Sequence, residues 1–375
     1  MRFFGRLMFV LTVLLFAGLA SSSSFAKAVK VGVVLPMTGP IASFGQSDWK
    51  GIKIAASLKP TVLNGRKLKL ILLDNKGDKV ETANAVSRLI FKNKVSAVIG
   101  AVASGNTLSG APIAEKAHVP MVTPASTNPL VTKGKKFISR VCFIDPFQGK
   151  VAAKYVYNNL HARTAAVIVD MAQDYSVGLA RFFIKAFKKM GGKIVGNTFI
   201  QTGDQDFSAQ IAVVKAHHPD VIYMPTYYQE LALFARQARQ FGLKQTIMAG
   251  DGASEEALIK VGGKAVEGLS FTNHFDPKAA VTPLGKKFVK LYRAKYHEDP
   301  SAMAALGADA YFVVANAINR AGSTNRIKIN KAIRATKGFK GVTGIITLVN
   351  GDPVKSAVIQ KVKDGKFVYV TTVNP

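Results

Sequence analysis

Strand-like apolar runs alternate with helix-like patterns along most of the chain, and this alternation constrains the fold most. In the first part, the apolar runs are 29–36, 68–74, 95–100 and 119–124. Such uninterrupted runs are typical of parallel strands that are buried on both faces. Helix-like stretches separate them, at 46–58 and around Val80 to Ile90. Since a helix between strands creates a parallel crossover, the pattern predicts an α/β fold with a doubly wound sheet.

The same architecture begins again in the second part of the chain. Strand-like runs fall at 164–170, 193–200, 220–226 and 245–251, and helix-like stretches at 176–190, 206–216 and 229–241. A chain of 375 residues is also longer than one ordinary domain. We therefore predict two doubly wound α/β lobes.

The last part of the chain has a different pattern. Helix-like stretches at 283–297 and 302–321 precede short strand-like runs at 344–348, 356–362 and 367–373. We expect this part to pass between the lobes. The prediction is a first lobe of residues 27–145 plus 276–350, a second of 146–275 plus 351–375, and a hinge that the chain crosses several times.

The first 26 residues have the features of a secretory signal peptide. Arg2 and Arg6 are followed by an apolar run at 7–20, and Ser24 and Ala26 suit a cleavage site. The apolar run is shorter than the roughly 20 residues that a spanning helix needs. We expect cleavage near Ala26 and export of the remainder.

Charge and composition argue against several other classes of site. Lys and Arg outnumber Asp and Glu by 51 to 22, but the basic runs 133–136 and 185–189 are short and lack neighbouring aromatic platforms. A generally basic surface is therefore favoured over a nucleic-acid site. Cys142 is the only cysteine, which excludes an internal disulfide, and the adjacent His217 and His218 are expected in a loop. We predict no metal site and no cofactor.

Ligands of doubly wound sheets bind beyond the carboxyl ends of the strands, so the residues at these ends are candidates for a binding site. In the first lobe the candidates are hydroxyl residues: Ser104, Thr107, Ser126 and Thr127. Hydroxyls and backbone N–H groups near helix starts suit an anion. In the second lobe the candidates are acidic or aromatic: Asp174, Tyr175, Tyr227, Tyr228 and Asp251. A carboxylate among aromatic rings suits a cation, so an amino acid is the simplest ligand that fits both lobes.

Each of these residues also has an ordinary structural explanation. Ser104 and Thr127 follow strands, where Ser and Thr are common helix N-caps. Asp251 precedes Gly252, a typical turn pair. Tyr175 and Tyr227 could be aromatic residues of an interface.

Several segments, in this order and at these separations, resemble one family. They are "VGVVLPMTGPIASFGQSDWKGIKIA", "GAVASGNTLSGAPIAEKAHVPMVTPASTNP", "QDYSVGLAR", "GDQDFSAQI" and "LFARQARQFGLK". Together they resemble the type I periplasmic binding proteins, in the leucine/isoleucine/valine-binding branch that serves ABC importers. The resemblance covers nearly all of the chain after residue 26. It implies the two-lobed type I fold and binding by hinge closure.

The resemblance also implies roles for individual residues. Ser104 and Thr127 correspond to residues that bind the ligand carboxylate, and the Ala125 carbonyl to one that accepts from the ligand ammonium. Ser126 lies in the same "PAST" segment. Asp251 corresponds to the acidic residue, usually Glu in the family, that binds the ammonium.

The implied side-chain pocket is aromatic and carries no fixed charge. Its walls correspond to Phe44, Tyr175 and Tyr227. Such a pocket favours a neutral apolar amino acid, with a branched-chain one implied by the family. A single methylene is worth only about 1–3 kcal/mol in an apolar pocket, so the sequence does not select among these side chains.

The expected protein is thus a monomeric periplasmic binding protein that delivers an amino acid to a membrane permease and binds no nucleic acid. The alternative with the same fold is a protein that binds an amide, a urea-type compound or an aromatic acid for import or sensing. An enzyme is disfavoured, because no GxSxG, GxxxxGK[ST] or strand-linked GxGxxG motif occurs. Catalytic residues are therefore not assigned.

Overall fold

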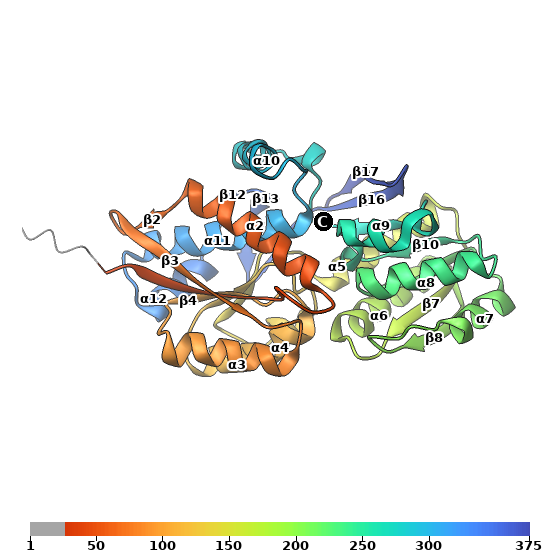
Figure 1. Ribbon diagram of the computed structural model, residues 1–375, viewed down its shortest axis with the longest axis horizontal. Coiled ribbons are helices and arrows are strands. Elements are labelled where there is room, and N and C mark those ends of the chain that lie inside the picture. Colours follow the sequence, from red (N-terminus) through yellow and green to blue (C-terminus); the bar gives the residue numbers. More distant parts are fainter. Residues whose placement is uncertain (1–26) are drawn as a thin grey trace, which may run out of the picture.

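The computed structural model describes residues 27–375, so the predicted signal peptide lies outside the described residues. The chain forms two lobes that lie side by side, each with a large sheet covered by helices (Figure 1). Lobe 1 contains the six-stranded sheet and lobe 2 the seven-stranded sheet. The predicted pair of doubly wound α/β lobes is confirmed.

The sheet of lobe 1 has the strand order β2-β3-β1-β4-β5-β6. Its strands are β1 (Val29–Leu35), β2 (Thr61–Val62), β3 (Arg66–Asp74), β4 (Ala97–Gly100), β5 (Met121–Thr123) and β6 (Ile138–Arg140). All of them pair in parallel except β2, which is antiparallel to β3 at the edge. β1 lies in the middle of the sheet, with helices on both sides, which explains why the successive residues Val33 and Val34 are both buried although they face opposite sides.

The sheet of lobe 2 has the order β17-β16-β11-β10-β9-β7-β8. Its strands are β7 (Thr164–Asp170), β8 (Lys193–Ile200), β9 (Val221–Tyr223), β10 (Thr246–Ala249), β11 (Ser270–Asn273), β16 (Ala357–Lys363) and β17 (Lys366–Val373). The first five are parallel, and the C-terminal pair β16 and β17 is added antiparallel. β11 was not predicted from the sequence.

Helices cover both sheets. Lobe 1 carries α2 (Ala42–Leu58), α3 (Lys79–Ser87), α4 (Ser104–Lys116), α10 (Pro283–Tyr296), α11 (Ala302–Ala321) and α12 (Arg326–Arg334), with the short strands β12 (Phe339–Gly341), β13 (Gly344–Ile346), β14 (Leu348–Val349) and β15 (Asp352–Pro353). Lobe 2 carries α5 (Asp145–Asn158), α6 (Asp174–Lys189), α7 (Ser208–His217), α8 (Tyr228–Gln240) and α9 (Glu256–Gly262). α11 is long and apolar enough to span a membrane, but 89% of its apolar 18-residue window is buried inside the protein, as expected of a core helix.

The chain passes between the lobes three times, at 141–144, 274–282 and 354–356. This agrees with the predicted hinge that the chain crosses several times. For this reason the C-terminal helices, blue in Figure 1, lie in the same lobe as the red N-terminal segment. The first and third crossings are joined by Lys355, whose buried ammonium donates to the Val141 carbonyl at 3.0 Å and also contacts Thr343 and Asp309.

Candidate functional site

A cavity lies between the lobes, near the carboxyl ends of both sets of strands. In this closed structure its free volume is small, about 10 Å³. Its lining residues come from both lobes: Phe44, Val102, Ala103, Ser104, Ala125, Met303, Tyr175, Tyr227, Asp251 and Gly252.

The lobes are closed over this cavity. The hydroxyls of Ser43 and Ser47 in α2 donate to Glu255 of lobe 2, at 2.9 and 2.8 Å. On the other side, the Asn128 amide of lobe 1 donates to the Asp174 carbonyl of lobe 2 at 2.7 Å. These contacts join the lobes at two places around the cavity.

The lobe 1 side of the cavity presents backbone N–H groups and hydroxyls. Ser104 is the first residue of α4, whose N-cap is Ala103, and its hydroxyl accepts from the Asn128 N–H at 3.3 Å. Ser104 therefore does not occupy the N-cap position that was one interpretation of the sequence. The buried hydroxyl of Thr127 has no hydrogen-bond partner among residues 27–375. Together with the positive end of the α4 dipole, this side suits an anion.

Ser126, in contrast, takes part in a network behind the cavity wall. Its hydroxyl donates to the Val102 carbonyl at 2.7 Å and shares a 2.6 Å hydrogen bond with Thr107. Its own carbonyl accepts from the fully buried guanidinium of Arg140 at 2.5 Å. The contacts of Ser126 thus shape the loop that carries Ala125 and Thr127.

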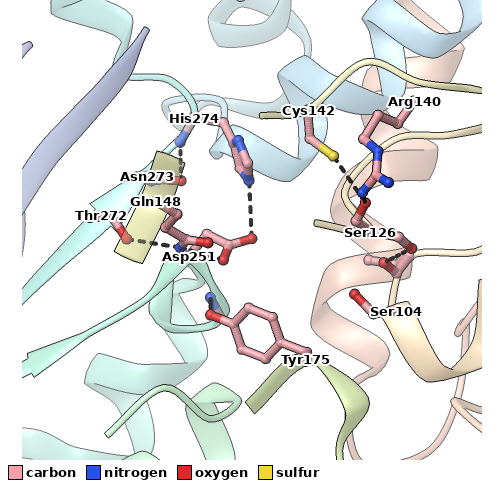
Figure 2. Close-up of polar contacts among 12 residues, drawn as sticks. Ser104, Ser126, Arg140, Cys142, Gln148, Tyr175, Asp251, Thr272, Asn273 and His274 are labelled. Carbon is pink, nitrogen blue, oxygen red and sulfur yellow. Dashed lines mark hydrogen bonds and ion pairs between the residues drawn. The ribbon is translucent and has the colours of Figure 1, made fainter. Parts of the chain in front are cut away.

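The lobe 2 side presents Asp251, which begins a 3₁₀ turn after β10 and is only 3% exposed. One carboxylate oxygen accepts from the Gln148 amide at 2.7 Å, and the other lies 3.0 Å from Nε2 of His274 (Figure 2). The next residue, Gly252, donates its N–H to the Tyr175 hydroxyl at 3.1 Å. Asp251 is thus held on two sides by lobe 2, with part of its surface facing the cavity.

Aromatic rings form the remaining wall. Tyr175 and Tyr227 are stacked, with ring centroids 5.3 Å apart, and Phe44 meets Tyr227 edge-on at 5.6 Å from the other lobe. Burial raises the pKa of both tyrosines well above 10, so their hydroxyls remain neutral. This wall is therefore apolar and uncharged.

Six of the eight predicted site residues line the cavity: Phe44, Ser104, Ala125, Tyr175, Tyr227 and Asp251. Ser126 and Thr127 lie outside the set of lining residues that the structure describes. The sequence interpretation did not include Met303, Gln148 and His274. A signal existed for His274, because it directly follows β11 at the same sheet edge, whereas Met303 and Gln148 lie on helices that only the tertiary structure brings to the site.

Cys142 lies close to the site but is not accessible. It is fully buried, its sulfur is 3.4 Å from the Ser126 carbonyl, and burial raises the pKa of the thiol to about 12. Within residues 27–375 there is no cluster of three or more His, Cys, Asp or Glu side chains that could hold a metal ion.

The family described as "Periplasmic binding protein" matches this chain over residues 28–366. The chain belongs to this family. It is 32% identical to a leucine-, isoleucine-, valine-, threonine- and alanine-binding protein of Pseudomonas aeruginosa, with 90% of each chain covered. It is also 32% identical to a Leu/Ile/Val-binding protein of Escherichia coli, with 75% of this chain and 76% of that protein covered.

Solved structures of the family agree with the fold. The leucine binding protein LivK of Thermotoga maritima superposes with a TM-score of 0.91 at 54% identity, covering 93% of this chain and 99% of that one. LivJ of Streptococcus pneumoniae, a branched-chain amino acid transporter substrate binding protein in complex with isoleucine, gives a TM-score of 0.88 at 32% identity, covering 93% and 100%. The predicted family and the type I fold are confirmed.

Proposed function

We propose that this protein is the solute-binding component of an ABC importer and that it closes on leucine, isoleucine or valine. The observation that supports this most is the cavity itself. The Ser104 hydroxyl and a helix N-terminus lie on one side of it, Asp251 on the other, and aromatic rings between them. The relatives named above bind the same class of amino acid.

In this proposal the ligand carboxylate binds Ser104, Thr127 and the N–H groups at the start of α4. The ammonium binds Asp251 and the Ala125 carbonyl, and the apolar side chain contacts the aromatic wall. Because different lobes hold the two charged ends, both ends are satisfied only when the lobes close. Closure is then favoured by the difference in contacts between the open and closed states.

The proposal extends to the surroundings of the protein. Membership of the periplasmic binding protein family supports a location in the periplasm, where a membrane permease would receive the closed form. We propose a monomer whose lobes are divided close to the predicted limits, 27–145 plus 276–350 for lobe 1 and 146–275 plus 351–375 for lobe 2, with the last limit moved to the crossing at 354–356 because β15 packs in lobe 1. The proposed role is binding, and no step requires a catalytic group or a cofactor.

A thermal-shift titration of the mature protein, refolded after removal of any bound ligand, tests the proposal. Leucine at a hundred times its Kd should add about 2.7 kcal/mol of stability. Asp251→Asn should remove most of the shift, because the ammonium loses its countercharge. If only amides, urea-type compounds or aromatic acids shift the transition, the fold is kept but the proposed ligand is wrong.

A further inference from the structure

Asp251 is the only carboxylate among the residues that line the cavity within the described part of the chain, and both of its oxygens already have donors. His274 follows Asp251 by 23 residues along the chain, and Gln148 precedes Asp251 by 103 residues. Figure 2 shows His274 above Asp251 and Gln148 beside it, with Ser104 across the site. The geometry around Asp251 is therefore built from three separate elements of lobe 2.

The imidazole of His274 is held in place independently of any ligand. Its ring packs against Phe143 in a tilted arrangement with centroids 3.7 Å apart, and its backbone N–H donates to the Asn273 side chain at 2.8 Å. An ionised carboxylate only accepts hydrogen bonds, so Nε2 must carry the proton that faces Asp251. Burial lowers the pKa of His274, which keeps the ring neutral and leaves the negative charge of Asp251 uncompensated within this pair.

We propose that His274 is a specificity-determining residue, which holds the Asp251 carboxylate oriented toward the cavity so that the site selects ligands with an ammonium group over otherwise identical ligands without one. This inference rests on the proposed function, since it assumes an amino-acid ligand. Gln148 assists by donating to the second oxygen and is itself fixed by Thr272, which lies 2.8 Å from the same amide nitrogen.

The expected direction follows from what His274 does for Asp251. In this closed structure the hydrogen bond joins His274, at the start of the second crossing, to Asp251 of lobe 2. Without this donor the carboxylate is held from one side only, by Gln148, and can turn away from the cavity. Binding of an ammonium would weaken, whereas a ligand without that group would lose nothing.

The test compares leucine with 4-methylpentanoate, which has the same chain and carboxylate but no amino group, by calorimetric titration of the ligand-stripped mature protein. His274→Phe keeps a ring on Phe143 but has no donor. It should weaken leucine binding by about 10- to 100-fold, the value of a hydrogen bond to a charged group, and leave 4-methylpentanoate unchanged or tighter. His274→Gln can still donate to Asp251 and should restore most of the preference for leucine.

Matched controls separate the possible outcomes. His118→Asn changes another histidine that packs against a phenylalanine, Phe137, outside the cavity lining, and should keep the wild-type ratio of the two affinities. If His274→Phe weakens both ligands equally, or if His274→Gln loses as much preference as His274→Phe, the inference is overturned. If His274→Phe does not fold, His274→Asn, which is too short to reach Asp251, must show the same loss of preference. If the wild type binds no leucine, the proposed function fails first.

Discussion

Arg140 donates from Nε to Asp352 across 2.7 Å, and this ion pair links the end of β6 to β15, which directly precedes the third crossing between the lobes. The Arg140 side chain is fully buried, whereas that of Asp352 is 29% exposed. The remaining nitrogens of the guanidinium donate to the carbonyls of Ser126 and Asn128. One buried cation therefore holds both β15 and the loop that carries Thr127.

Arg140→Met should lower the free energy of unfolding by about 3–5 kcal/mol in urea titrations. Removing one partner of a buried ion pair leaves the other groups without compensation, and here several carbonyls lose their donor as well. Lys260→Met breaks an exposed pair with Glu256 and is the control, with an expected loss below about 1 kcal/mol. Similar losses for the two variants would contradict a structural role for Arg140.

The interlobe contact of Glu255 predicts a pH dependence. Burial raises the pKa of this carboxyl to about 7, although the hydroxyls of Ser47 and Ser43 lower it in part. The closed protein thus binds more protons than the unfolded chain between about pH 4.5 and 7. The contribution of Glu255 to stability is present at low pH and is lost as the pH rises through this window, at up to about 1.4 kcal/mol per pH unit.

Glu255→Gln should flatten this part of the profile, because an amide does not titrate and can still accept from Ser43 and Ser47. Urea unfolding of wild type and variant at several values between pH 5 and 8 measures the difference. Nearby Asp48 also has a raised pKa because of burial and contributes to the wild-type profile. The difference between the wild-type and Glu255→Gln profiles therefore reports on Glu255. Parallel profiles would show that Glu255 does not titrate in this range.

Ser104→Ala should weaken leucine binding by about tenfold, the typical value of one hydrogen bond, and should affect leucinamide less because that ligand lacks a carboxylate. Ser109→Ala is the matched control in the same helix. Its hydroxyl donates to the carbonyls of Lys79 and Asn106, away from the cavity lining. Calorimetric titration that gave equal losses for the two variants would remove Ser104 from the site.

Gly51→Ala should destabilise lobe 1 by about 1–3 kcal/mol or more, because overpacking displaces the backbone. A Cβ at Gly51 would lie only 1.8 Å from the Ala304 carbonyl oxygen, where α2 meets α11. Gly196→Ala in β8 is the control, since its nearest neighbour would be the Ala166 Cβ at an acceptable 3.4 Å. Thermal unfolding that ranked Gly196→Ala as the more damaging change would contradict the close approach of the two helices.

The regular elements were predictable where their apolar pattern was long and local. The strands at 164–170 and 193–200 and the helix at 302–321 have the predicted bounds. The predicted strand at 344–348 is instead divided between β13 and β14, which pair with different partners. β11, a strand of only four residues inside the sheet of lobe 2, was missed because so short a run has too little periodicity.

The order of strands and helices along this chain, and therefore its two doubly wound lobes, follows from the sequence alone. Hydrophobic periodicity is a local property, so it can be read from the sequence. Because ligands bind at the carboxyl ends of the strands, the sequence also identifies Ser104 and Asp251 as candidate site residues. The tertiary structure decided what those residues contact. It placed Ser126 behind the cavity wall and set His274 and Gln148 against Asp251. Such contacts depend on how the sheet edges and lobes meet, and no local pattern in the sequence records that relationship.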